Sequence, residues 1–337
     1  MLRLPELEVI IATSLTEALT RLAAGPAARP ILGGTDLVAN LKTGHTKAQT
    51  LVAIGQLPEL QGVDASGDVV RIGAAVHQAE LARDPDILEL FPALAYAVGR
   101  IASPQIRNAG TLGGNLCLDT RCRFINQSDL WREALGGCLK SHGKECHVIP
   151  GGGGCVAALS ADSVPILMVL GAEAEIARVQ DGALVTRRTP IADLYDSDGR
   201  RHVRIADGEL LVAVHVPKLP HGARAVYRKW AVRQSIDFPL VSVAVRLDLD
   251  DAGKLKQGKV AIGVLGPRPR LLALDRWAGR TLDEDLAKQV AQYVFDRSHP
   301  LPNVLYDHEY RRERLRVEVL RALRTWYAPA AVGGAGR

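Results

Sequence analysis

The chain has 337 residues, of which 47% are hydrophobic and 23% charged, and its net charge is +5. This balance is typical of a folded globular protein and excludes an intrinsically disordered one. No apolar run approaches the roughly 18 residues that a membrane-spanning helix needs, and the N-terminus lacks the pattern of a signal peptide. The sequence therefore predicts a cytoplasmic protein of two or three domains with no membrane contact.

The distribution of basic residues argues against a nucleic-acid partner. Six arginines gather between residues 311 and 324, but no aromatic residues alternate with them. Single-stranded nucleic acids are usually bound by such aromatic side chains, on which the bases stack. We expect instead a helix whose arginines face solvent or another subunit.

Residues 10–24 have the pattern of a packing helix. Ser14 and Glu17 stand three residues apart, as in a capping box. Apolar residues follow at helical spacing, and the segment GPAARP then ends the pattern.

The next segment, residues 31–37, is called here the first glycine loop. A short strand ends at Leu32, Gly33 and Gly34 can form a tight turn, and Thr35 or Asp36 can cap the helix that follows. This order can aim free backbone N–H groups at an anion such as a pyrophosphate. An ordinary strand-to-helix turn has the same pattern, so both interpretations stay open at this point.

A second polar segment, residues 103–116, is called here the second glycine loop. It combines Thr111 and Asn115 with three glycines, in the sequence SPQIRNAGTLGGNL. Glycines among polar residues suggest a backbone folded closely around a ligand. Two such loops in one domain favour a ligand of the nucleotide type.

The C-terminal third has a different pattern. Pro217 and Pro220 mark a boundary, and residues 222–272 predict three antiparallel strands with a hairpin turn at DAGK. Two helical patterns follow. Strands followed by helices indicate a separate α+β domain.

All five cysteines lie between residues 117 and 155, in a glycine-rich segment. Four of them have the spacing C-x15-C-x7-C-x8-C, which matches neither zinc knuckles nor ferredoxins. Clustered thiols in a reducing compartment favour zinc or an iron–sulfur cluster over disulfides. His142 and His147 are possible zinc ligands. Cys117 directly follows the second glycine loop, and we interpret it as a small residue that packs near the ligand of that loop. The metal candidates are therefore Cys122, Cys138, Cys146 and Cys155.

Several segments occur together in an order that resembles a known family. They are RPILGGTDL, IRNAGTLGGNL, ADSVPILMVLGAEAEI and YRKWAVRQSIDFPLVSVAV. The chain resembles the FAD-binding medium subunits of the xanthine oxidase or molybdenum hydroxylase family, which includes carbon monoxide dehydrogenase flavoproteins. The resemblance covers nearly the whole chain.

This resemblance implies which residues contact FAD. The two glycine loops would hold the pyrophosphate, an aspartate would lie near the adenosine, and a lysine near the flavin. The implied contacts are Ile31, Leu32, Gly33, Gly34, Thr35, Asp36, Leu37, Ile101, Thr111, Gly114, Asn115, Asp162 and Lys229.

The cysteine-rich segment departs from the usual pattern of the family. The flavin subunits of 4-hydroxybenzoyl-CoA reductases, one branch of the family, have an insert at this point that carries a [4Fe–4S] cluster. The resemblance implies a molybdenum-cofactor large subunit and a [2Fe–2S] small subunit as partners, in an (αβγ)2 assembly. It also implies ferredoxin as electron donor and the reductive conversion of 4-hydroxybenzoyl-CoA to benzoyl-CoA.

The expected fold class is α+β. A two-part FAD-binding domain would span residues 1–220, with subdomains 1–55 and 56–220 and an iron–sulfur loop insert at 117–156. A C-terminal domain would span 221–328, and residues 329–337 would form a flexible tail.

The chain has no evident set of catalytic nucleophile and base, so we expect an electron conduit. The hypothesised order is ferredoxin, [4Fe–4S], FAD, the partner's [2Fe–2S] clusters and molybdenum. Two alternatives stay open. One is an oxidising hydroxylase subunit that uses NAD or a quinone and holds structural zinc, and the other is a scaffold that has lost FAD.

Overall fold

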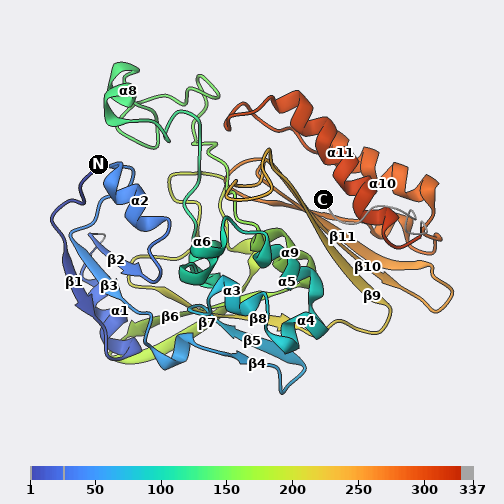
Figure 1. The fold of residues 1–337 in the computed structure, drawn as a ribbon, viewed down its shortest axis with the longest axis horizontal. Coiled ribbons are helices and arrows are strands. Elements are labelled where there is room, and N and C mark those ends of the chain that lie inside the picture. Colours follow the sequence, from blue (N-terminus) through green and yellow to red (C-terminus); the bar gives the residue numbers. More distant parts are fainter. Residues whose placement is uncertain (1, 26, 328–337) are drawn as a thin grey trace.

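The computed structural model describes residues 2–25 and 27–327, which are organised around three β-sheets (Figure 1). The predicted tail at 329–337 lies outside the described residues. No helix in the described ranges is long and apolar enough to cross a membrane.

The first sheet is parallel, with β3 (Thr50–Ala53) between β1 (Glu8–Ile11) and β2 (Ala28–Ile31). Helix α1 (Leu15–Ala23) lies between β1 and β2 in the chain, and α2 (Leu37–Lys42) follows β2. The helix predicted over 10–24 was therefore too long at its start. The β-branched run Val9–Ile11 pairs with β3 instead, as such residues favour strands.

The second sheet has five antiparallel strands in the order β4-β5-β8-β6-β7. Helices from two stretches of chain lie beside it. The strands are β4 (Val63–Asp64), β5 (Val69–Gly73), β6 (Glu173–Gln180), β7 (Ala183–Pro190) and β8 (Leu210–Pro217). The helices are α3 (Gln78–Leu81), α4 (Pro85–Leu90), α5 (Pro92–Gly99), α6 (Pro104–Ala109), α7 (Leu112–Leu116) and α9 (Ser163–Leu170).

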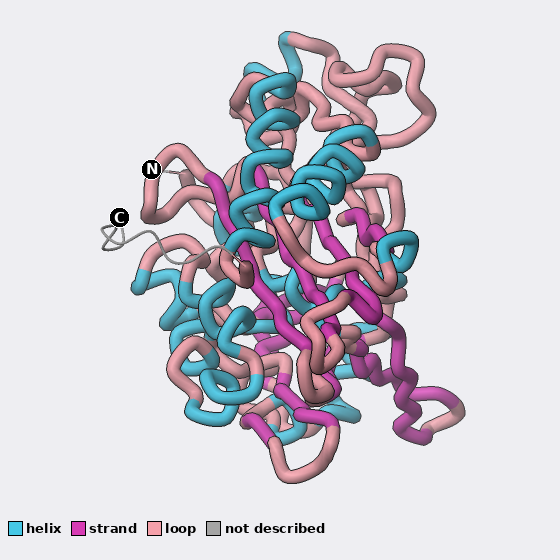
Figure 2. The backbone as a smooth tube through the Cα atoms, turned by 90° about the vertical axis from the view of Figure 1, so that its right-hand side faces the viewer, coloured by secondary structure: helices cyan, strands magenta, loops and turns pink. Residues whose placement is uncertain are grey.

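The third sheet is antiparallel, in the order β12-β11-β10-β9. Its strands are β9 (Ala223–Trp230), β10 (Val241–Leu249), β11 (Leu255–Gly263) and β12 (Arg270–Ala273). We predicted three strands here, but the described residues form four, because Arg270–Ala273 pairs with the end of β11. Helices α10 (Glu284–Asp296) and α11 (His308–Arg324) pack on this sheet and share its apolar core (Figure 2).

Helix α9 contacts both the second and the third sheet, so the helix lies where the two meet. Single-turn 3-10 helices occupy Pro58–Leu60, Ile191–Asp193 and Asp275–Trp277.

The cysteine segment, residues 117–156, connects α7 to the strand-like stretch before α9. It consists mostly of loops, with one short helix, α8 (Asp129–Ala134). In Figure 1 it stands at the top of the molecule, away from the five-stranded sheet. Arg121 and Ala158 exchange two backbone hydrogen bonds, of 2.8 and 2.7 Å, and these close the base of the segment.

Candidate functional site

The two glycine loops lie directly against each other. A Cβ atom added to Gly33 would be 1.7 Å from the carbonyl oxygen of Ala109, which precedes Gly110 in the second loop. No side chain fits in that space, so glycine at position 33 is required for the loops to meet. Since Gly33 and Ala109 are 76 residues apart in sequence (109 − 33), their contact is a product of the tertiary fold.

The first glycine loop has free backbone donors. Ile31 ends β2, Leu37 begins α2, and the turn between them includes Gly34 with a positive φ of 68°. Within the described part of the chain, the N–H groups of Gly33 and Thr35 donate to no other group, and both residues are exposed. These unused donors suit an anionic ligand such as a pyrophosphate.

Asp36 does not cap α2 as expected. It occupies the N-cap position, but its side chain makes no capping bond. One carboxylate oxygen lies 2.5 Å from an Arg121 nitrogen, and the other accepts a hydrogen bond of 2.9 Å from Asn40. Asp36 therefore ties the first glycine loop to the start of the cysteine segment.

In the second glycine loop, Thr111 caps α7 as its type suggests. Its hydroxyl accepts a 3.1 Å hydrogen bond from the backbone of Gly114. Asn115 is buried, and its side-chain oxygen accepts bonds from the hydroxyl (2.6 Å) and the N–H (3.2 Å) of Ser163. The second loop is thus joined to the first turn of α9.

Asp162 and Lys229 form a buried ion pair, with 3.1 Å between the carboxylate and the ammonium group. Tyr227 donates a 2.7 Å hydrogen bond to the other carboxylate oxygen. Burial raises the pKa of Asp162, while the charge of Lys229 opposes that rise. We had expected Asp162 near the adenosine and Lys229 near the flavin. Their direct contact places both at one part of the site.

Ile101 lies beside this pair. Lys229 donates a 2.9 Å hydrogen bond to the carbonyl of Arg100, so the buried ammonium group touches the turn that carries Ile101. The next residue, Ala102, has a positive φ of 40°, and its carbonyl accepts from the N–H of Ile236 (3.0 Å), itself at φ 66°. Strained backbone of this kind is frequent around ligand sites.

The predicted FAD contacts thus follow one continuous path. It runs from the first glycine loop through the second loop to Asp162, Lys229 and Ile101. Sequence reasoning missed Tyr227 and Arg121. Tyr227 had a signal, because it precedes Lys229 by two positions on a strand and therefore shares its face. Arg121 had none.

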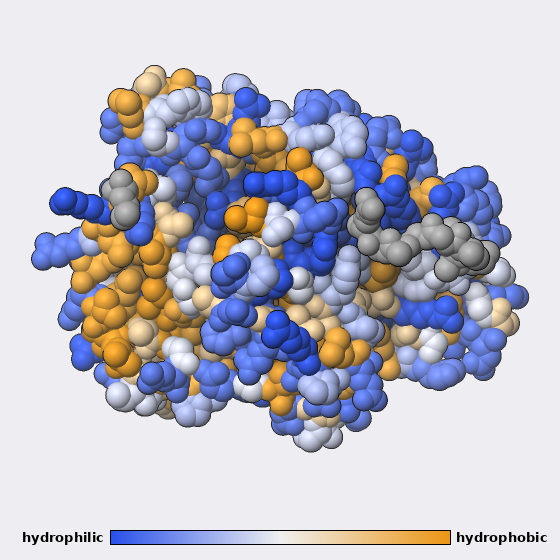
Figure 3. All heavy atoms as spheres, in the orientation of Figure 1, coloured by the Kyte–Doolittle hydropathy of each residue, from blue (hydrophilic) through white to orange (hydrophobic). Residues whose placement is uncertain are grey.

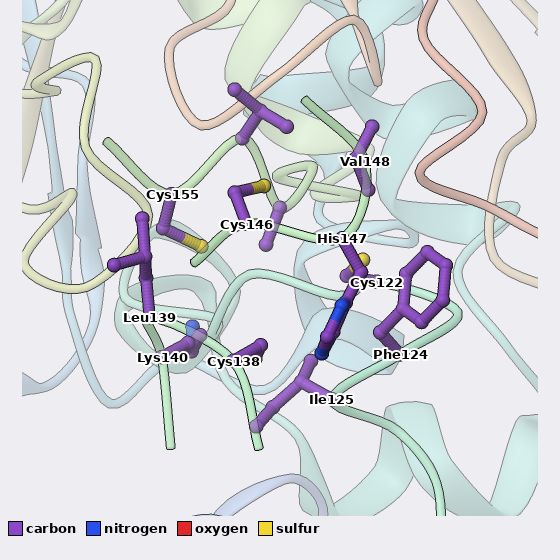
Figure 4. Close-up of a pocket in the computed structure, with 12 residues that line it drawn as sticks. Cys122, Phe124, Ile125, Cys138, Leu139, Lys140, Cys146, His147, Val148 and Cys155 are labelled. Atoms are coloured by element: carbon purple, nitrogen blue, oxygen red, sulfur yellow. The ribbon is translucent and has the colours of Figure 1, made fainter. Parts of the chain in front are cut away.

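The four predicted cysteine ligands surround a single cavity (Figure 4). Cys122, Cys138, Cys146 and Cys155 all line it, together with apolar side chains that include Phe124, Ile125, Leu139 and Val148. The volume of this cavity is about 10 Å³. Cys117 does not line this cavity, and it is not one of the four predicted metal ligands.

Backbone N–H groups point at two of these sulfurs. Burial raises the pKa of the Cys122 thiol to about 11, while hydrogen bonds from the backbone of Phe124 and Ile125 act to lower it. Burial also raises the pKa of Cys155, against a hydrogen bond from the backbone of Ala157. Donors of this kind stabilise thiolates that ligate a metal centre.

The thiols do not converge on one point. Among the residues that the structure describes, no three His, Cys, Asp or Glu side chains form a site for a single metal ion. His147 lines the cavity, but its Nε2 atom lies 2.5 Å from the carbonyl oxygen of Gly137 and is engaged there. His142 does not line the cavity.

Two family models match the chain. That of the FAD binding domain in molybdopterin dehydrogenase matches residues 5–219, and that of the CO dehydrogenase flavoprotein C-terminal domain matches residues 225–326.

Relatives and solved structures agree with these matches. The aldehyde oxidoreductase FAD-binding subunit PaoB of Escherichia coli K12 is 32% identical over 281 residues, which cover 80% of this chain and 82% of the relative. The 6-hydroxypseudooxynicotine dehydrogenase complex subunit alpha of Paenarthrobacter nicotinovorans is 27% identical over 324 residues, covering 95% and 94%. A carbon monoxide dehydrogenase structure from Hydrogenophaga pseudoflava shares the fold, with a TM-score of 0.77, 21% identity, and coverage of 97% and 99%.

The first family model alone covers well over half of the chain, and the relatives named above match most of its length. The chain therefore belongs to the FAD-binding medium subunits of the molybdenum hydroxylase, or xanthine oxidase, family.

Proposed function

We propose that this chain is the flavin and iron–sulfur subunit of a ferredoxin-dependent 4-hydroxybenzoyl-CoA reductase. In this role it takes electrons from reduced ferredoxin and passes them towards [2Fe–2S] and molybdenum centres on partner subunits. The substrate would be dehydroxylated to benzoyl-CoA on the molybdenum subunit. The observation that carries the proposal is the cavity lined by four cysteines in a chain of the flavoprotein family.

The residues of the chain fit FAD. The glycine loops meet without side chains between them, and the first loop has exposed N–H groups for the pyrophosphate. Asp162, Lys229 and Ile101 would contact FAD at a second part of the site, where Asp162 and Lys229 form their ion pair. Thr111 and Asn115 would stabilise the second loop, because their side chains accept hydrogen bonds from the backbone N–H groups of Gly114 and Ser163.

We infer that the cysteine cavity holds an iron–sulfur cluster and not zinc. Four thiolates on one zinc ion all lie about 2.3 Å from the metal, so their sulfurs must converge. In a [4Fe–4S] cluster each iron takes one thiolate, so the four sulfurs surround a space instead. The position of all four thiols around one cavity, with N–H groups directed at two of them, supports the second arrangement.

The cluster cavity and the flavin loops are joined by direct contacts. Arg121, which binds Asp36 of the first glycine loop, immediately precedes Cys122. When bound, FAD and the cluster supply the redox chemistry, while the chain holds them at a fixed separation.

The partners are a molybdenum-cofactor large subunit and a [2Fe–2S] small subunit in an (αβγ)2 assembly. Figure 3 shows hydrophobic atoms gathered over the part of the molecule where β1 lies, and Val9 and Ile11 on that strand are 61% and 65% exposed. Apolar surface of this kind usually marks a contact with another protein. This surface supports assembly with a partner subunit.

A second candidate function is an FAD subunit of an oxidising molybdenum hydroxylase with an NAD or quinone acceptor. It is favoured by the names of relatives, such as the aldehyde oxidoreductase subunit of Escherichia coli K12. In that case the cysteine cavity would hold a structural metal.

The proposal predicts that Cys138→Ser removes the iron–sulfur signal and ferredoxin-linked activity but leaves FAD bound. The reason is that Cys138 lines the cavity, whereas the glycine loops do not depend on it. Cys117→Ser is the matched control, because Cys117 lies outside the cavity and should retain both cofactors. Iron, acid-labile sulfide and flavin contents together with EPR of the reduced protein provide the readout. Full ferredoxin-linked activity in Cys138→Ser would refute the proposal that electrons from ferredoxin enter the chain through the cluster.

A further inference from the structure

Asn303 lies at the contact between the C-terminal domain and the cysteine segment. It is fully buried. Its backbone carbonyl accepts a 2.7 Å hydrogen bond from the N–H of Arg123, and its side-chain amide donates a 2.8 Å bond to the carbonyl of Val156. Arg123 directly follows Cys122, and Val156 directly follows Cys155. One residue of the distant domain therefore holds the chain next to two of the four cysteines.

Asn303 is itself held in place by Arg311 of α11. An Arg311 nitrogen lies 3.4 Å from the side-chain oxygen of Asn303, which leaves the amide nitrogen facing Val156. The same guanidinium donates to the carbonyls of Leu240 (3.0 Å), Leu301 (3.0 Å) and Val264 (2.5 Å). Arg311 is 1% exposed, so this network is almost free of water.

The charge of Arg311 has no partner carboxylate in the described part of the chain. Burial alone lowers its pKa, to about 10. A buried cation that bonds only to neutral oxygens destabilises a fold, whereas apolar residues of similar size would not. The position of Arg311 is therefore better explained by the groups that it holds in place than by a gain in stability.

The backbone that Arg311 holds is strained. Val264 has a φ of 64°, a value that β-branched residues rarely adopt. The next carbonyl, that of Leu265, lies 3.4 Å from the amide nitrogen of Asn303, and the carbonyl of Gly266 accepts a 3.0 Å bond from Leu159 beyond the cysteine segment. The strained turn and Asn303 thus both hydrogen-bond to the stretch of chain that follows Cys155, through Leu159 and Val156 respectively.

We propose that Asn303 and Arg311 are positioning residues for the metal cluster: they fix the chain at Cys122 and at Cys155 relative to each other. This inference rests on the proposed iron–sulfur function. A cluster bound by four thiolates needs their separation fixed, and hydrogen-bonded residues behind the ligands commonly provide this. The C-terminal domain would then act as part of the cluster site although it contributes no ligand.

The test uses Asn303→Asp in the full chain. Aspartate keeps the volume and an oxygen for Arg311, and the backbone bond from Arg123 remains. It places an acceptor instead of a donor against the carbonyl of Val156. We expect iron per chain to fall at least about fivefold, or the EPR signal and midpoint potential of the remaining cluster to change, while FAD per chain stays at the wild-type level.

Val290→Ala is the control. Val290 lies in the core of the C-terminal domain on α10 and does not line the cysteine cavity. This variant should lower the melting temperature without changing the iron content or the EPR signal.

Three results would overturn the inference. The first is wild-type iron, EPR signal and potential in Asn303→Asp. The second is a parallel loss of iron and FAD, which would indicate a general folding defect. In the third, Val290→Ala loses iron to the same degree. If the wild-type protein itself holds no iron, the proposed function fails first and the inference fails with it.

Discussion

Gly33 shows how single atoms shape the candidate flavin site. Its missing side chain lets two loops touch, and its own N–H group remains free for an anion. At the same scale, the ion pair of Asp162 and Lys229 depends on burial of both groups. Removal of one partner would leave an uncompensated charge, which typically costs about 3–5 kcal/mol.

Gly33→Ala is predicted to separate the glycine loops, because the new Cβ would meet a backbone oxygen that cannot rotate away. We expect a loss of about 1–3 kcal/mol in the free energy of unfolding and at least about tenfold weaker FAD binding. Urea denaturation and flavin titration measure the two effects. Gly67→Ala is the control, since its nearest atoms would be 4.0 Å away. Equal FAD affinity in both variants would disprove the contact.

His202 predicts how stability depends on pH. Burial, followed by the charge of Lys140, lowers its pKa to about 4, and its Nε2 donates a 2.9 Å bond to the carbonyl of Leu118. Below pH 6.5 the unfolded chain binds a proton at this histidine that the folded chain does not bind until about pH 4. The linked stability is therefore complete above pH 6.5 and lost as pH falls to 4, on the order of 3 kcal/mol.

The measurement is the melting temperature between pH 7.5 and 4.5, for the wild type and for His202→Gln. The variant cannot gain this proton, so its stability should fall less over this range. Parallel curves for the two proteins would show that His202 does not titrate as described.

At the scale of helices and strands, local chemistry predicted much of what formed. The hydroxyl of Ser14 accepts from the backbone of Glu17 at 3.2 Å, as in a capping box, but the Glu17 carboxylate accepts from the N–H of Thr13 (2.9 Å) and not from that of Ser14. Strands β1 and β12 were missed, since each has four residues and lies at the edge of its sheet. The β-branched residues of β1 favour a strand, but the local sequence does not show which distant strand β1 or β12 pairs with.

Thr111→Val tests the element that supports the second glycine loop. The change keeps the shape of the side chain but removes the cap on the Gly114 N–H, which should cost about 1 kcal/mol and weaken FAD binding. Thr111→Ser should restore both, because it keeps the hydroxyl. Flavin retained after gel filtration and urea denaturation report the outcome. The role of the cap would be contradicted if Thr111→Val lost neither stability nor FAD binding, or if Thr111→Ser failed to keep both.

At the scale of the whole molecule, the fold joins sites that the sequence keeps apart. Residue types predicted the gathering of the four cysteines, which line one cavity, since thiols have few other uses at such density. The contact of Gly33 with Ala109 and the hold of Asn303 on the cysteine segment were not predictable. Both contacts join residues far apart in sequence. No motif near Asn303 indicates that it contacts the cysteine segment.

The central claim is that one chain holds FAD and an iron–sulfur cluster. Anaerobic purification followed by counting of flavin, iron, acid-labile sulfide and zinc tests it most directly. We predict about one FAD, four iron and four sulfide per chain, and an EPR signal that develops on reduction. Flavin with zinc in place of iron and sulfide, or flavin with no metal, would contradict the claim.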